Sequence, residues 1–273
     1  MAKIYGIVGH PVNKSLSPAM HNAAIKHLGL DAEYKLFDID PSDTENLANF
    51  CYETDLNNIG GFSVTMPYKM AIMAYMDHYD PLAKIVGSVN TVVSEENKLI
   101  GYNTDAMGAT QALRKKTDLI GKKALVMGAG GAARAIIYSL KEFGVDVHLF
   151  NRTMEKAEEL ADLWDLETIE YRMIPKADFD IIINATPVGS MPNTGESLLH
   201  SDQIPSHAVV MDIITNPLET QLLKEAKKAG ATPISGERML LWQAVNQFRL
   251  FFDKEPPVEV MEKALYEELK KRK

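Results

Sequence analysis

Cysteine is almost absent from this sequence: Cys51 is the only one among 273 residues. A single thiol excludes an internal disulfide and a metal site built from several cysteines. No apolar run approaches the roughly eighteen residues of a membrane-spanning helix. The apolar segment at residues 4–8 is too short for the core of a secretion signal. We therefore expect a cytoplasmic protein that has no membrane association and requires no metal.

An excess of positive charge is also lacking. The 29 Lys and Arg residues face 37 Asp and Glu residues, which leaves a formal charge of −8. A negative protein repels a phosphate backbone, so nucleic acid is not an expected partner. The 46% hydrophobic and 24% charged residues are ordinary for a globular protein and exclude a disordered chain. At about 150 residues per domain, the length favours two domains.

Short apolar runs alternate with amphipathic segments of helical length, a pattern typical of α/β folds. The pattern restarts after residues 115–117, so we place the domain boundary within the helical stretch 105–116. Strands are predicted at residues 3–8, 32–39, 61–65, 89–94, 99–102, 124–127, 147–150, 181–184 and 209–213. Helices are predicted at residues 18–28, 44–52, 68–76 and 258–270, and from the glycine-rich turn at 128–131 through residue 143.

A glycine-rich turn follows the strand predicted at 124–127, and an apolar helix follows the turn. This order is typical of a dinucleotide-binding fold. Gly128 permits the tight turn, Gly130 lets the backbone approach a pyrophosphate, and Ala133 allows close packing of helix on strand. The N–H groups at the start of the helix face the phosphates. A purely structural turn is the alternative. The predicted cofactor residues here are Gly128, Ala129, Gly130, Gly131 and Ala132.

The residues after the next strand indicate which dinucleotide binds. An NAD-specific fold usually has an Asp or Glu there, which accepts bonds from the ribose hydroxyls. This chain has Asn151, Arg152 and Thr153 instead. The guanidinium can form charge-assisted bonds to a 2′-phosphate, and the threonine hydroxyl can add a donor. Lys156 is a further candidate. We predict NADP; the alternative is that these cations are solvated surface charges.

Hydroxyl groups near the first predicted helix suggest an anion site. Ser17 suits the N-cap of this helix and Pro18 its first position. A pair of hydroxyls at a helix N-terminus can also hold a carboxylate, and the capping role explains Ser15 less well.

Other polar residues lie near the ends of predicted strands, where open α/β sheets bind ligands. Thr65 is at a strand end, and Lys69 is about one turn into the next predicted helix. Asn90 and Asp105 lie near two further strand termini. Each has a structural alternative: a surface lysine, a turn residue and a helix N-cap, respectively.

Together these motifs resemble the shikimate dehydrogenase family along nearly the whole chain. The matching blocks are residues 15–18, 63–69, 87–91, 103–105, 128–133, 151–153, 184–189 and 236–243. The resemblance implies an α/β substrate domain with a mostly parallel sheet at residues 1–102 plus about 238–273, and a Rossmann NADP-binding domain at 103–237. The C-terminal helices then pack back on the first domain, and the protein is a monomer or a homodimer.

The family reduces 3-dehydroshikimate to shikimate with NADPH, reversibly, in the pathway to chorismate and the aromatic amino acids. The resemblance implies that Lys69 and Asp105 are the acid–base pair, with the proton location left open. A nearby ammonium can stabilise and protonate the oxygen that becomes negative when hydride arrives. The other implied substrate residues are Ser15, Ser17, Thr65, Asn90 and Gln243. The further implied cofactor residues are Thr186, Ile213 and Gly236.

The chain departs from the family pattern in two places. Thr215 stands where the family usually has a tyrosine, and it is too short to make the same substrate contact. Ser190 is an extra residue before Met191, in a loop expected to cover the cofactor.

Two alternatives to the leading hypothesis follow from these comparisons. Residues 239–243 look like relatives that use both quinate and shikimate, often with NAD, so a dual quinate/shikimate dehydrogenase is the first alternative. A ligand-sensing regulator without turnover is the second. The presence of Lys69 and Asp105 argues against the regulator, as does the lack of a DNA-binding segment.

Overall fold

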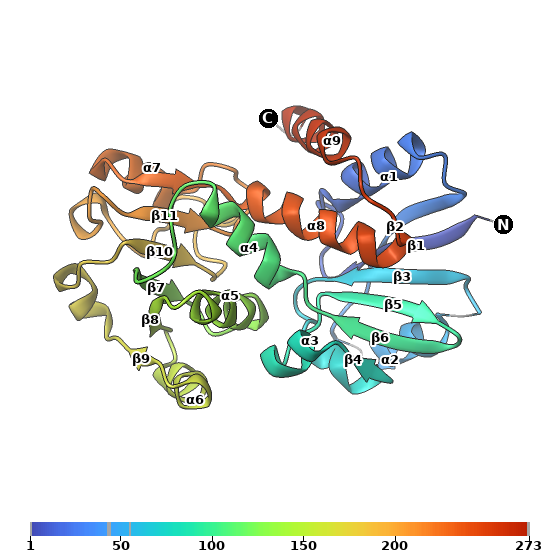
Figure 1. Ribbon diagram of the computed structural model, residues 1–273, viewed down its shortest axis with the longest axis horizontal. Helices are drawn as coiled ribbons and strands as arrows, with labels where there is room; N and C mark the ends of the chain where they lie inside the picture. The colour runs from blue at the N-terminus through green and yellow to red at the C-terminus, as the bar shows by residue number, and fades with distance from the viewer. Residues whose placement is uncertain (1, 43–44, 55, 272–273) are drawn as a thin grey trace. The chain divides into compact units, whose positions relative to one another are not determined.

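The computed structural model describes residues 2–42, 45–54 and 56–271, and the chain forms two compact units. The first unit comprises Met1–Thr104 and Gln243–Lys273, and the second comprises Asp105–Trp242. Figure 1 follows the chain from one unit to the other and back. The C-terminal segment is thus part of the first unit, although the second unit separates the two in sequence.

Within the described residues, the first unit contains a six-stranded sheet. Its strands are β1 (Lys3–Gly9), β2 (Ala32–Asp38), β3 (Ile59–Val64), β4 (His78–Tyr79), β5 (Thr91–Glu95) and β6 (Lys98–Tyr102). Their order is β2-β1-β3-β5-β6-β4. β1 is parallel to β2 and β3, and β4 is parallel to β6, whereas β5 is antiparallel to both of its neighbours.

Helices cover both faces of this sheet (Figure 1). They are α1 (Ser17–His27), α2 (Glu45–Tyr52), the 3₁₀ helix η1 (Ala71–Tyr75), α3 (Pro81–Val86), the C-terminal part of α8 (Gly236–Phe252) and α9 (Val258–Lys271). On one face Cys51 and Ile72 pack with Phe62 in a buried cluster. On the other, the rings of Tyr34 and Phe251 pack against each other, and α1 lies along α9. Residue 44, where we predicted the start of the second helix, lies outside the described residues.

The helix predicted at residues 68–76 is wrong. The segment forms turns followed by the short 3₁₀ helix η1. The Lys69 carbonyl, which an α-helix would offer to the Met73 N–H, accepts instead from Val89 N–H at 2.8 Å. Met73 N–H donates to the Met70 carbonyl at 3.2 Å, which is the spacing of a 3₁₀ helix. A long-range hydrogen bond has therefore replaced a local one.

The second unit, all of whose residues are described, has a fully parallel sheet. Its strands are β7 (Lys123–Met127), β8 (Asp146–Phe150), β9 (Glu167–Thr168), β10 (Ile181–Asn184), β11 (Val209–Asp212) and β12 (Thr232–Ile234). The order β12-β11-β10-β7-β8-β9 reads 3-2-1-4-5-6 from the other edge, which is the Rossmann order. The predicted α/β class and the Rossmann fold are thus confirmed.

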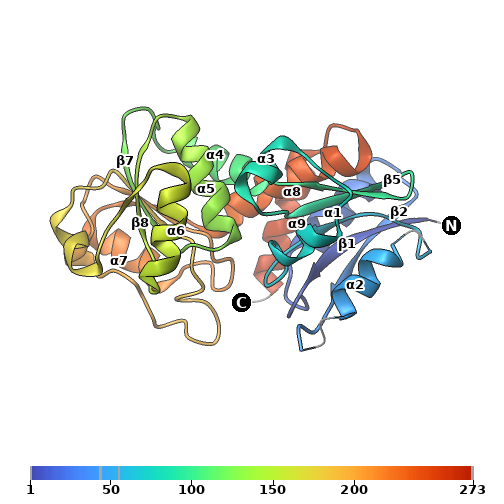
Figure 2. The same cartoon turned by 90° about the horizontal axis from the view of Figure 1, so that it is seen from below.

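Helices also cover this second sheet. They are α4 (Asp105–Arg114), α5 (Gly131–Glu142), α6 (Met154–Trp164) and α7 (Gln221–Ala229), with the 3₁₀ helices η2 (Tyr171–Lys176) and η3 (Ser201–Gln203). Ile136 of α5 and Leu160 of α6 belong to one buried cluster, and Leu222 of α7 and Ile174 of η2 belong to another. Figure 2 shows α5 and α6 beside β7 and β8. Among the described residues, no helix is long and apolar enough to cross a membrane.

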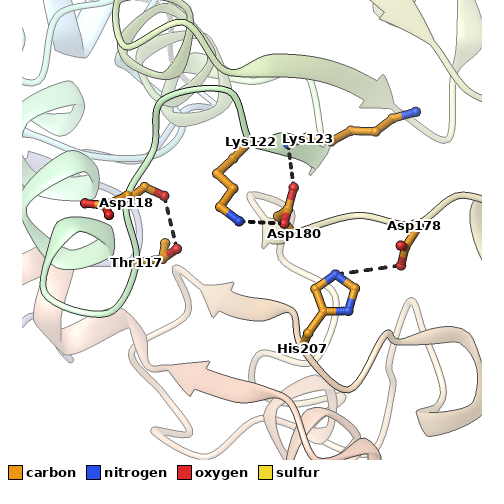
Figure 3. Close-up of polar contacts among 7 residues, drawn as sticks. All are labelled: Thr117, Asp118, Lys122, Lys123, Asp178, Asp180 and His207. Carbon is orange, nitrogen blue, oxygen red and sulfur yellow. Dashed lines mark hydrogen bonds and ion pairs between the residues drawn. The ribbon is translucent and has the colours of Figure 1, made fainter.

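An ion-pair cluster joins the amino ends of two central strands of the Rossmann sheet (Figure 3). The Lys122 ammonium lies 2.9 Å from one oxygen of Asp180, and the Lys123 N–H donates to the other at 2.9 Å. Partial burial of the Asp180 carboxyl acts to raise its pKa, but these two donors outweigh it and lower the pKa overall. The cluster ties β7 to the segment that precedes β10, at the edge opposite the glycine-rich turn.

Candidate active site

Three strands of the first sheet end, and β5 begins, at the same edge. Thr65 N–H donates to the Val8 carbonyl at 2.9 Å, and Val64 N–H donates to the Asn90 carbonyl at 2.7 Å. Asn90 N–H in turn donates to the Tyr102 carbonyl at 3.0 Å. These bonds bring Thr65 and Asn90 to one sheet edge although the sequence separates them.

The Asn90 side chain is fully buried and has a fixed orientation. Its Oδ1 accepts from Thr104 N–H at 2.8 Å and from Thr91 Oγ1 at 2.8 Å, while its Nδ2 donates to Thr104 Oγ1 at 3.0 Å. A backbone N–H can only donate, so the atom that faces it must be the amide oxygen. The buried amide therefore cannot turn over without breaking several hydrogen bonds.

Lys69 lies in the turns between β3 and η1, not within a helix as predicted. Its side chain is half-buried. The hydrogen bond between its carbonyl and Val89 N–H joins this turn to the residue immediately before Asn90. Lys69 and Asn90 are thus on neighbouring segments of the same unit.

The capping role predicted for Ser17 is wrong, because α1 begins at Ser17 itself and Leu16 before it already has helical backbone angles. The local hydrogen bond comes from Ser15 instead, whose Oγ accepts from Ser17 N–H at 3.2 Å. Ser17 is buried and close to the Tyr34 hydroxyl, whereas Ser15 is half-buried. Both hydroxyls lie on the loop that leads from β1 into α1.

The remaining substrate candidates lie at the points where the chain passes between the units. Asp105 is fully buried and begins α4, directly after Thr104. Gln243 is half-buried in α8, at the residue where the chain re-enters the first unit.

The glycine-rich turn of the second unit has two glycines with different roles. Gly128 has a φ of +117°, and a Cβ there would lie 3.0 Å from the Ala185 carbonyl oxygen, so the turn itself requires glycine. Gly130 has a φ of −82°, and a Cβ there would meet no protein atom within 4 Å. The backbone of Gly130 thus borders open space at the start of α5. That arrangement fits a dinucleotide pyrophosphate.

The rest of the turn and the loop after β8 lie where the sequence predicts them. Ala129 precedes α5, and Gly131 and Ala132 form its first residues. Gly128 N–H donates to the Phe150 carbonyl at 2.7 Å, which joins this turn to the end of β8. The loop that follows β8 carries Asn151, whose Nδ2 donates to the Thr153 carbonyl at 2.8 Å. Exposed residues of this region are Arg152, Thr153 and Lys156.

A buried polar network, missed in the sequence, shapes the loops after β10 and β11. Asn184 Oδ1 accepts from both the N–H and the hydroxyl of Thr186, at 3.0 and 2.7 Å. Asn184 Nδ2 donates to Asp212 Oδ1 at 3.2 Å, and Thr220 donates to Asp212 Oδ2 at 2.7 Å. Burial raises the pKa of Asp212 despite these donors. The sequence signal that could have indicated this network is the polar residue at the end of each apolar strand, Asn184 in β10 and Asp212 in β11.

The other predicted residues of this edge lie in the same loops. Gly236 is buried, and a Cβ there would overlap the carbonyl oxygens of Ile213 and Ile214. Met191, in the loop with the extra Ser190, donates its N–H to the Asn216 carbonyl at 3.3 Å. That bond joins the loop to the one that carries Thr215, which is half-buried. Within the described ranges, no group of three His, Cys, Asp or Glu side chains is arranged to hold a metal ion.

Three family models match the chain. The shikimate dehydrogenase substrate-binding domain matches residues 7–92, shikimate / quinate 5-dehydrogenase matches 110–222, and the shikimate 5′-dehydrogenase C-terminal domain matches 236–266. A curated relative from Methanobrevibacter smithii, named shikimate dehydrogenase (NADP(+)), is 43% identical over 96% of both chains.

Solved structures give the same result. A shikimate dehydrogenase in complex with NADP⁺ has a TM-score of 0.92 at 41% identity and covers 98% of this chain and 96% of its own. The enzyme from Thermus thermophilus, in complex with NADP(H) and shikimate, has a TM-score of 0.90 at 36% identity and covers 98% of this chain and 100% of its own. Matched motifs, fold and full-length similarity agree: this chain belongs to the shikimate dehydrogenase family.

Proposed function

We propose that this protein is an NADP-dependent shikimate dehydrogenase that reduces 3-dehydroshikimate to shikimate with NADPH, reversibly. The observation that carries this proposal is the similarity along nearly the full length to relatives named for this activity and cofactor. The fixed amide of Asn90 and the open space beside Gly130 supply the local features that such an enzyme needs. As for the family, we propose a cytoplasmic monomer or homodimer.

Five side chains of the first unit are proposed to bind the substrate. Ser15 and Ser17 would hold the carboxylate, since their hydroxyls lie at the start of α1, where the helix dipole favours an anion. Thr65, Asn90 and Gln243 would bind the ring hydroxyls. A rigid Asn90 suits this task, because a pre-oriented amide loses little conformational entropy on binding.

Lys69 and Asp105 are the proposed acid–base pair. When bound, NADPH supplies the hydride that reduces the C3 carbonyl. The Lys69 ammonium would then donate a proton to the C3 oxygen, and in the oxidation direction Lys69 would take that proton back. A carboxylate nearby favours the charged lysine, so Asp105 would assist reduction. Thr215 remains a candidate contact in place of the usual tyrosine.

The cofactor residues are proposed to act at three positions along the dinucleotide. The turn of Gly128, Ala129, Gly130, Gly131 and Ala132 would hold the pyrophosphate. Arg152, Thr153 and Lys156 would bind the 2′-phosphate, with Asn151 shaping the loop. The loops that carry Thr186, Ile213 and Gly236 would border the nicotinamide half.

Initial rates measured at the nicotinamide absorbance band test this function. Shikimate and quinate are each paired with NADP and with NAD, and we expect the highest kcat/KM for shikimate with NADP. A preference for quinate with NAD would favour the dual quinate/shikimate dehydrogenase instead. Binding of shikimate without turnover in any pairing would favour the ligand-sensing regulator.

A further inference from the structure

Gln247 is a buried residue of α8, one turn after Gln243, and it bonds to two segments of the first unit that are distant in sequence. Its Oε1 accepts from Ser63 Oγ of β3 at 2.9 Å. Its Nε2 lies 3.2 Å from the Asn90 carbonyl and 3.2 Å from Thr91 Oγ1. A helix from the end of the sequence therefore contacts the sheet edge that carries Asn90.

The direction of these hydrogen bonds is determined. The Asn90 carbonyl can only accept, so the amide nitrogen of Gln247 must face it and the amide oxygen must face Ser63. Ser63 donates its one proton to that oxygen, so the Tyr34 hydroxyl, 2.6 Å away, must donate to Ser63. At the other end, Thr91 Oγ1 accepts from Gln247 and donates to Asn90 Oδ1.

The chain of hydrogen bonds therefore runs one way, from Tyr34 through Ser63, Gln247 and Thr91 to the amide oxygen of Asn90.

Burial raises the pKa of the Tyr34 hydroxyl, so it remains a donor. Its ring stacks on His21, with centroids 4.3 Å apart, and burial lowers the pKa of His21 to about 3, which keeps that imidazole neutral. Tyr34 is also close to Ser17, at the proposed carboxylate position.

We propose that Gln247 is a positioning residue of this enzyme, which orients the Asn90 amide toward the ring hydroxyls of the substrate. This inference rests on the proposed function. It needs a side chain that both accepts from Ser63 and donates to the Asn90 carbonyl, which an amide does and a carboxylate cannot. A carboxylate of the same shape could still accept from Ser63, but it would place an acceptor against the Asn90 carbonyl. It would also require Thr91 to donate to residue 247 instead of to Asn90.

Gln247→Glu is the first test. We expect kcat/KM for shikimate to fall at least tenfold, while KM for NADP changes less than twofold. The reason is that the new carboxylate oxygen and the Asn90 carbonyl are two buried acceptors with no proton between them, which is costly. The ratio of kcat/KM between shikimate and analogues lacking one ring hydroxyl should also collapse, since a misoriented amide no longer distinguishes them. A purely structural defect would lower both rates together and leave this ratio unchanged.

Asn246→Asp is the matched control, with the same chemical change on the neighbouring residue of α8. The Asn246 oxygen accepts from Arg249 at 2.9 Å, and a carboxylate keeps this hydrogen bond. We expect kcat/KM for shikimate to stay within twofold of the unmodified protein.

Thr91→Val decides the question if Gln247→Glu does not fold. It keeps the shape of the side chain but removes the hydroxyl that links Gln247 to Asn90. We expect a similar loss of discrimination between shikimate and the analogues that lack one ring hydroxyl. Side-chain amide NMR signals of Asn90, in labelled protein without ligands, should shift in both variants but not in Asn246→Asp. The inference would be overturned by a folded variant with unchanged Asn90 signals and an unchanged ratio of kcat/KM between shikimate and the analogues that lack one ring hydroxyl. An inactive unmodified protein would instead overturn the proposed function, while the NMR result still tests whether Gln247 orients Asn90.

Discussion

The two sheet edges that carry the candidate residues are built in opposite ways. In the first unit, side chains make the edge: the Asn90 amide is buried and held by Thr91 and Thr104. In the second unit, the backbone makes it: Gly128 forms the turn and Gly130 leaves space beside the start of α5. Its cations, Arg152 and Lys156, are exposed.

This difference follows from the two ligands proposed. A small ring with several hydroxyls is distinguished from similar rings only by donors and acceptors held in fixed directions. A pyrophosphate needs close approach to backbone N–H groups, which a side chain would block. The first edge should therefore be sensitive to isosteric changes of polarity, and the second to added volume.

Lys69→Ala should give the largest effect. Removing the proposed general acid should lower kcat by about 10²-fold or more, with little change in the thermal unfolding temperature. Steady-state rates in both directions measure this. Lys84→Ala, which removes an exposed lysine of α3 in the same unit, serves as the control and should retain kcat. Near-normal turnover by Lys69→Ala would disprove the acid–base assignment.

The glycine-rich turn allows a paired test of volume against strain. Gly130→Val should fold normally, because its Cβ meets no protein atom, yet it should raise KM for NADP and for NAD at least tenfold by filling the pyrophosphate position. Gly128→Ala should instead destabilise the fold by about 1–3 kcal/mol, because of its positive φ and the nearby Ala185 carbonyl. Urea unfolding and cofactor titration separate the two effects. Equal destabilisation by both would contradict the assigned roles.

Arg152→Ala should have a smaller and more selective effect. Loss of a charge-assisted bond to the 2′-phosphate should raise KM for NADP roughly tenfold and leave KM for NAD nearly unchanged. The ratio of the two KM values is the measurement. An equal loss with both cofactors would show that Arg152 supports the pyrophosphate region or the loop itself.

Asp180→Asn, at the end of the Rossmann sheet opposite the glycine-rich turn, should have the smallest effect and only on stability. The folded state lowers the pKa of Asp180, so its contribution is present above the unfolded pKa near 4 and is lost as the pH falls through the lower folded pKa. With the side chain 27% exposed, the loss at pH 7 should be about 0.5–1 kcal/mol. Urea unfolding from pH 7 to pH 3 measures it. Asp178→Asn, whose carboxylate is 84% exposed, should show almost no change.

Much of the fold could be predicted because its strands have strong local patterns. All nine predicted strands lie within two residues of the observed ones. The strands not predicted, β4, β9 and β12, have only two or three residues and lie at or next to sheet edges, too short for a hydrophobic pattern to emerge. The helix at 68–76 failed because a hydrogen bond from Val89, distant in sequence, took the Lys69 carbonyl.

The sequence by itself determined the α/β class, the glycine-rich turn and the cationic loop at Arg152, because each depends on residues that are adjacent along the chain. Only the tertiary structure showed that Gln247 bonds to Ser63 and Asn90, because those contacts span more than 150 residues. The same holds for the open space beside Gly130. Local patterns are set by backbone preference and periodicity, whereas the direction of a buried amide is set by neighbours that folding alone brings together.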